Sequence, residues 1–77
     1  MVEDEELFSQ IMHLCESKVE EFALLGYENV SAEEIWACVS SAYKELPPMH
    51  KIVNDILTLK INKYMNWIML KMYKNSN

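Results

Sequence analysis

The chain has 77 residues and a net charge of −5 at pH 7, with 51% apolar and 25% charged residues. This composition excludes intrinsic disorder, and the length predicts one domain, residues 1–77, with a thin core. Gly26 is the only glycine, which argues against a β-rich fold with many tight turns and against a phosphate-cradling loop. An all-α fold is therefore expected.

The first predicted helix covers residues 3–25. Its apolar residues recur every three or four positions, so they share one side of an amphipathic helix. They are Leu7, Phe8, Ile11, Met12, Cys15, Val19, Phe22 and Leu25. Glu16, Glu20 and Glu21 lie on the other side, as a solvated face or as a docking surface for a basic partner. Gly26 follows, where a left-handed residue commonly ends a helix.

The second predicted helix begins at Ala32. Ser31 and Glu34 match a capping box, in which each side chain accepts a hydrogen bond from the other residue's backbone N–H. The helix is expected to continue until Pro47 and Pro48, because proline cannot extend a helix. Its predicted apolar side consists of Ile35, Val39, Ala42, Tyr43 and Leu46, with Trp36 at the edge.

A third helix is predicted over residues 49–57 and a fourth over residues 61–74. The segment 58–60 is a weaker helix former, and we expect a break or a kink there. One continuous helix over residues 49–73 and a strand over residues 56–61 are the alternatives. The elements together predict a small antiparallel bundle of three to four short helices.

Few side chains suggest catalysis, a metal site or a cofactor. The residues of zinc-ligand type are His13, Cys15, Cys38 and His50, and their spacing matches no zinc module. Both cysteines are interpreted as buried apolar residues. Asn54 and Asp55 are polar residues in an apolar segment, expected to satisfy backbone groups at the 58–60 break or, alternatively, to contact a ligand.

The last predicted helix has two distinct sides. Ile61, Met65, Ile68 and Met72 fall together and are expected to face the core. Almost opposite lie Lys60, Lys63, Trp67, Lys71 and Lys74. The functional interpretation of this second side is a nucleic-acid contact, with lysines on phosphates and the indole on an unpaired base. The alternatives are an ordinary solvated face, which the pattern by itself favours, and a contact with acidic groups of a partner or of the first helix.

Charge is divided unevenly along the chain. Residues 1–48 contain eleven acids and two lysines, whereas residues 49–77 contain five lysines and one acid. This asymmetry favours an interaction surface over a catalytic pocket. The acidic N-terminus does not resemble a signal peptide and no apolar run approaches the length of a membrane span, so a cytoplasmic protein is expected.

Two stretches resemble a known family. They are LLGYENVSAEEIWACV, residues 24–39, and HKIVNDILTLKINKYMNWIMLKMYK, residues 50–74. Together they look like the ComN-type post-transcriptional regulators of Firmicutes. The resemblance implies a small, non-catalytic cytoplasmic regulator that acts on messenger RNA of competence genes. It also implies an association with the cell pole and septum through a coiled-coil scaffold protein of the DivIVA kind.

Two functional hypotheses follow. In the first, the lysines and the indole of the last helix contact RNA directly. In the second, the chain is a protein–protein adaptor that affects RNA only through partners, which its acidic total charge favours. The segment 40–48 is shorter and less basic than the family resemblance leads us to expect. Homo-oligomerisation is a further possibility, because so short a chain buries little surface by itself.

Overall fold

The computed structural model describes residues 2–75, and within that range it contains four helices and no strand. They are α1 (Val2–Leu24), α2 (Ala32–Ser40), α3 (Met49–Leu57) and α4 (Ile61–Asn75). The expected all-α class is confirmed, and the 58–60 break separates α3 from α4. Neither the continuous helix nor the strand that stood as alternatives is formed.

Helix α1 ends as its sequence predicts. Gly26 has a φ of +100°, in the left-handed region that favours glycine. The backbone N–H of Tyr27 donates to the Phe22 carbonyl at 2.9 Å, and that of Gly26 donates to the Ala23 carbonyl at 3.0 Å. This pair of bonds is a Schellman motif, which satisfies carbonyls that the end of the helix leaves without partners.

Helix α2 begins at its capping box. The Ser31 hydroxyl accepts from the Glu34 backbone N–H, and a Glu34 carboxylate oxygen accepts from the Ser31 N–H, both at 3.2 Å. The predicted extension to Leu46 is wrong, because the helix stops at Ser40. The Ser41 hydroxyl donates to the Cys38 carbonyl at 2.7 Å, the kind of local bond by which serine competes with helix continuation.

The break between α3 and α4 is made by Thr58 and Leu59. The Thr58 backbone N–H and hydroxyl both donate to the Asn54 carbonyl, at 2.9 and 2.7 Å. The Leu59 side chain is 5% exposed and belongs to the core. The turn is therefore fixed on one side by hydrogen bonds and on the other by apolar burial.

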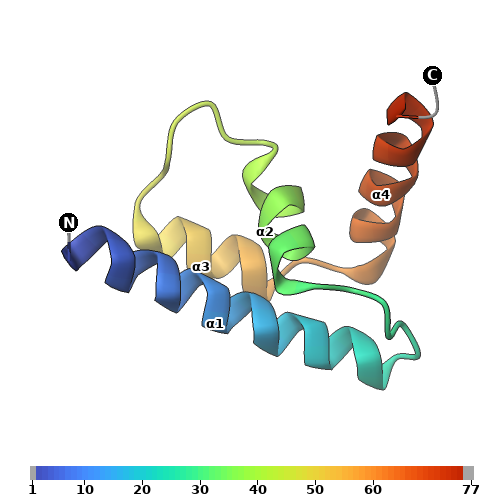
Figure 1. Cartoon of the computed structure of the whole chain (residues 1–77), viewed down its shortest axis with the longest axis horizontal. Coiled ribbons are helices and arrows are strands. Elements are labelled where there is room, and N and C mark those ends of the chain that lie inside the picture. The colour runs from blue at the N-terminus through green and yellow to red at the C-terminus, as the bar shows by residue number, and fades with distance from the viewer. Residues whose placement is uncertain (1, 76–77) are drawn as a thin grey trace.

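The four helices form a flat molecule with extents of 37 × 31 × 19 Å. Figure 1 shows α1 and α3 side by side and running in the same direction, because the 41–48 connection returns the chain toward the start of α1. The expected antiparallel arrangement does not describe this pair. Helices α2 and α4 rise steeply from the other two (Figure 1). None of the helices in the described range combines the length and hydropathy that a membrane crossing needs.

The core lies where the four helices meet. Its buried members are Ile11, Cys15, Phe22, Ile35, Cys38, Val39, Ile52, Ile56, Leu59 and Tyr64. Both cysteines are free and buried. Phe8 and Leu25, at the two ends of the stripe predicted for α1, are more than half exposed. The middle of that stripe therefore supplies the burial.

One charged side chain is enclosed in this apolar surrounding. Lys18 is 3% exposed. Its Nζ donates to the Leu57 carbonyl at 2.9 Å and to a Glu21 carboxylate oxygen at 3.0 Å. Leu57 is the last residue of α3, so the ammonium group satisfies a carbonyl at the negative end of that helix.

Helix α4 contacts the core mainly through Tyr64. This residue is 2% exposed, and its ring centroid lies 5.7 Å from that of Phe22. Ile61, Met65 and Ile68 are half-buried beside it, as predicted. The inward position predicted for Met72 is wrong: the residue is 64% exposed, because the second half of α4 has little of the core beside it.

Candidate functional site

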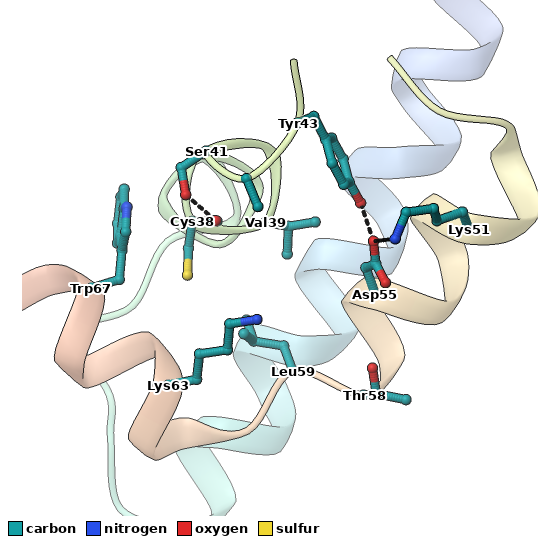
Figure 2. Close-up of a pocket in the computed structure, with 11 residues that line it drawn as sticks. Cys38, Val39, Ser41, Tyr43, Lys51, Asp55, Thr58, Leu59, Lys63 and Trp67 are labelled. Atoms are coloured by element: carbon teal, nitrogen blue, oxygen red, sulfur yellow. Dashed lines mark hydrogen bonds and ion pairs between the residues drawn. The ribbon is translucent and has the colours of Figure 1, made fainter. Parts of the chain in front are cut away.

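A cleft of about 250 Å³ opens between the C-terminal end of α2 and helices α3 and α4. Figure 2 shows Lys63 and Trp67 entering it from α4, with the indole beside Cys38 and Ser41. Asp55 lies on the α3 side of the cleft. Basic, aromatic and acidic groups thus face one another across a small space.

The α3 side of the cleft is held by a hydrogen-bonded group of three residues. The Tyr43 hydroxyl donates to the Asp55 carboxylate at 2.6 Å, and the Lys51 ammonium group donates to the same oxygen at 3.1 Å (Figure 2). These two bonds hold the pKa of Asp55 below its ordinary value, and the bond from Tyr43 is the larger cause. Burial, followed by the bond to Asp55, raises the pKa of Tyr43.

This arrangement corrects the role predicted for the Asn54–Asp55 pair. The Asp55 side chain does not satisfy backbone groups at the break, and Asn54 contributes there only through its backbone carbonyl. Asp55 instead joins the 41–48 connection to α3 through Tyr43. Sequence reasoning missed this partner because Tyr43 was placed on a helix that ends three residues before it.

The five candidate residues, Lys60 just before α4 and the other four on it, form one continuous row. Lys60 and Lys63 line a shallow hollow at the start of α4, Lys63 and Trp67 line the cleft, and Trp67, Lys71 and Lys74 line a second hollow together with Ser41. Consecutive hollows share a residue, so the row is unbroken, and its part from Lys63 onward borders the C-terminal end of α2. We call it the Lys/Trp row.

The lysines of the Lys/Trp row are available to a ligand. All four are exposed, and among the described residues no carboxylate lies within ion-pair distance of any of them. The ion pairs of the described range are made instead by His13, Lys18 and Lys51. The row is therefore a concentration of positive charge outside the ion pairs of the described range, on an otherwise acidic chain, with Asp55 facing Lys63 across the cleft.

Trp67 differs from the lysines beside it. Its indole is half-buried, with its ring centroid 6.2 Å from that of Tyr64. The Lys71 ammonium group lies 5.2 Å from the indole centroid, a cation–π contact. A base can stack on the indole face that Lys71 covers only if this lysine moves aside. The prediction that the row lies almost opposite the core-facing side of α4 is inexact, because the row borders the contact of α4 with α2.

The thiol of the cleft is not activated for nucleophilic attack. Cys38 carries this thiol, and burial raises its pKa more than nearby Lys63 lowers it. The thiol is therefore protonated at neutral pH and is a poor nucleophile. Within the described range, no three histidine, cysteine or acidic side chains are grouped as metal ligands. What the Lys/Trp row can do is bind anions such as phosphate.

Comparisons with known proteins agree with the resemblance noted in the sequence. The family described as Post-transcriptional regulator matches residues 5–77. A protein of Bacillus subtilis (strain 168), "Post-transcriptional regulator ComN", is 34% identical over 64 residues, covering 79% of this chain and 65% of that protein. The match thus spans just under two thirds of the relative's length. No solved structure matches the chain. The chain belongs to the Post-transcriptional regulator family, which is not an enzyme family, and is a distant relative of ComN.

Proposed function

We propose that the chain regulates messenger RNA of competence genes without catalysis, and that the Lys/Trp row of α4 contacts the RNA backbone. The observation that carries this proposal is the row's set of four exposed lysines with no described carboxylate partner. The family membership supports a role after transcription, and the competence transcripts come from the resemblance to ComN-type regulators.

The physical basis of binding is phosphate neutralisation. From Lys63 to Lys74 the row extends about 16 Å, given a rise of 1.5 Å per helical residue. Each lysine that meets a phosphate releases counterions, which favours binding and makes it sensitive to salt. The acidic residues of α1 repel phosphate, so an RNA strand approaches from the α4 side.

The test uses fluorescence anisotropy with a labelled RNA covering the leader of a competence-operon transcript. Changing Lys63 and Lys71 together to Gln should weaken binding and reduce the slope of log affinity against log salt by about 1.4, since each single-strand phosphate contributes about 0.7. Lys44→Gln is the matched control, because this exposed lysine lies outside the row. Equal affinities for the double variant and the wild type would exclude the row as the contact.

Trp67 needs a separate variant because it also packs on Tyr64. Trp67→Phe keeps an aromatic ring in that position, whereas Trp67→Ala also removes packing and lowers stability. If the indole stacks on a base, Trp67→Phe should reduce RNA affinity several-fold while the salt slope is unchanged. A reduced slope would instead show that the change had displaced Lys71.

The second candidate function is a protein adaptor that does not touch RNA. The observation that favours it is the acidic total charge together with the exposed Glu16 and Glu20 of α1, a surface suited to a basic partner. The resemblance points to a coiled-coil scaffold of the DivIVA kind, and to a cytoplasmic protein enriched at the septum or poles. Partners retained from ribonuclease-treated lysate, and lost in a Glu16→Gln/Glu20→Gln variant, would favour this function.

A further inference from the structure

The second half of α4 exposes an unusual amount of apolar surface. Of the ten large apolar side chains that are exposed in the described range, four lie between Met69 and Tyr73 and three more between Leu24 and Tyr27. A groove of about 340 Å³ lies between the 26–30 loop and the first half of α4, lined by residues 26–30, Glu34, Tyr64, Met65 and Ile68. A surface of this kind on a small protein marks an interaction site.

The apolar residues of α4 form a strip on a side of the helix separate from the lysines. At 100° per residue, Met65, Ile68, Met69 and Met72 fall within one third of the helix circumference, and we call them the methionine strip. Met65 and Ile68 line the groove, whereas Trp67, Leu70, Lys71 and Lys74 line the hollow on the other side. A partner on the strip therefore leaves the Lys/Trp row accessible.

The surface area of the chain indicates how large that partner contact is. A compact monomer of 9.1 kDa exposes about 4,900 Å² by the usual scaling with mass. This chain exposes 5881 Å², an excess of about 1,000 Å². A standard protein–protein interface buries about 800 Å² on each partner. The excess is thus of the size that one copy contributes to a stable dimer.

We propose that two copies of the chain pair through the methionine strips of their α4 helices, in antiparallel orientation about a two-fold axis. In this arrangement Met72 of each copy enters the groove beside Met65 of the other. The C-terminal end of one α4 then lies over the 26–30 loop of its partner, while Lys74 stays with the rest of the Lys/Trp row on the opposite side of the helix. The same contact is made twice, as a two-fold axis requires.

The oligomeric state of the full chain tests this proposal. Sedimentation equilibrium over a range of concentrations should show a species of twice the 9.1 kDa chain mass. Changing Met69 and Met72 together to Lys should raise the dimer dissociation constant by about 30-fold or more, the effect of losing central interface residues. A sample that sediments as a monomer up to its solubility limit would overturn the proposal.

The matched control is Leu70→Lys, an equally lipophilic and exposed position on the Lys/Trp side of α4. It should leave the dissociation constant unchanged within a few-fold, and far-UV circular dichroism should show that both variants keep their helices. A dimer weakened equally by Leu70→Lys, or unaffected by the Met69 and Met72 changes, would show that a different surface is used. RNA binding is measured separately, so failure here does not depend on the proposed regulatory role.

Discussion

At the scale of single residues, Lys18 is expected to have a large effect on stability. Its ammonium group is buried and donates to Leu57 and Glu21. Lys18→Ala leaves the Leu57 carbonyl without its partner and leaves a cavity where the aliphatic stem lay, so the free energy of unfolding should fall by about 2–4 kcal/mol. Urea unfolding followed by circular dichroism measures this change.

Two further variants separate the parts of this effect. Lys18→Met keeps most of the stem and should lose only about 1–2 kcal/mol. Glu21→Gln changes a partner that is more than half exposed, so its cost should stay within about 1 kcal/mol. A Lys18→Ala variant as stable as the wild type would mean that water replaces the ammonium group at the end of α3.

The burial of Lys18 could have been anticipated from spacing. It lies three residues after Cys15 and four before Phe22, both at the centre of the predicted stripe. A lysine at such a position must bring its charge to an acceptor, because an unpaired buried charge is very costly. That the acceptor is the last carbonyl of α3 could not be predicted, since it lies 39 residues away in the chain.

Asp55 makes stability depend on pH in a defined direction. An aspartate in the unfolded chain titrates near about 3.9, and bonds from Tyr43 and Lys51 lower the pKa of Asp55 in the folded chain. The stabilisation is therefore present above that pH and is lost as the pH falls through the folded-state pKa. Asp55→Asn should be less stable than the wild type at pH 7, and the difference should shrink below about pH 4.

Urea unfolding at a series of pH values measures this difference, and NMR titration of the Asp55 carboxyl measures the pKa directly. Tyr43→Phe is the matched control, because it keeps the ring and removes the bond that lowers the pKa most. The pKa of Asp55 should rise in that variant. A stability difference between Asp55→Asn and the wild type that is constant with pH would contradict the role of the charge.

At the scale of elements, α2 depends on its capping box. It is nine residues long, too short to be stable in isolation. Ser31→Ala removes the acceptor of the Glu34 N–H and should cost about 1 kcal/mol, or about 4–8 °C in melting temperature for a domain of this size. Ser31→Asn retains a capping side chain and should melt close to the wild type. Thermal unfolding followed at 222 nm distinguishes these outcomes.

Element boundaries set by local chemistry were predictable, and those set by packing were not. Gly26, Ser31 and Pro48 each mark a boundary from the residue type alone, and all three lie where expected. The end of α2 is different, because besides the local bond of Ser41 it is accompanied by a long-range bond from Tyr43 to Asp55 across the fold. The sequence pattern of the segment 41–48 does not predict that contact.

The candidate site illustrates the same distinction. Helical spacing predicts that the lysines of the Lys/Trp row share one side, and the structure brings them together in one row. The rotation of α4 about its own axis could not be obtained from that spacing, because it is set by the contact of Tyr64 with Phe22 and with Glu34 of α2. That rotation is what half-buries Trp67.

At the scale of the whole molecule, one core serves all four helices, so unfolding should be a single cooperative transition. The two cysteines can be used to follow this unfolding transition in different helices, because Cys15 lies on α1 and Cys38 on α2. Burial raises the pKa of both thiols, that of Cys15 to about 11. Each thiol should react with a thiol reagent at pH 8 only through opening of the fold.

For a core of this size the free energy of unfolding is about 3–5 kcal/mol, so labelling of both thiols should be slowed about 10²–10⁴-fold relative to the unfolded chain. Single-cysteine variants, Cys15→Ala and Cys38→Ala, assign the rates to each site. If residues 1–77 form one domain, the opening free energy from each variant equals its own free energy of unfolding from circular dichroism. Faster labelling of Cys38 than of Cys15 would instead show that the fold opens first around α2, at the cleft beside the Lys/Trp row, while the surroundings of Cys15 on α1 stay closed.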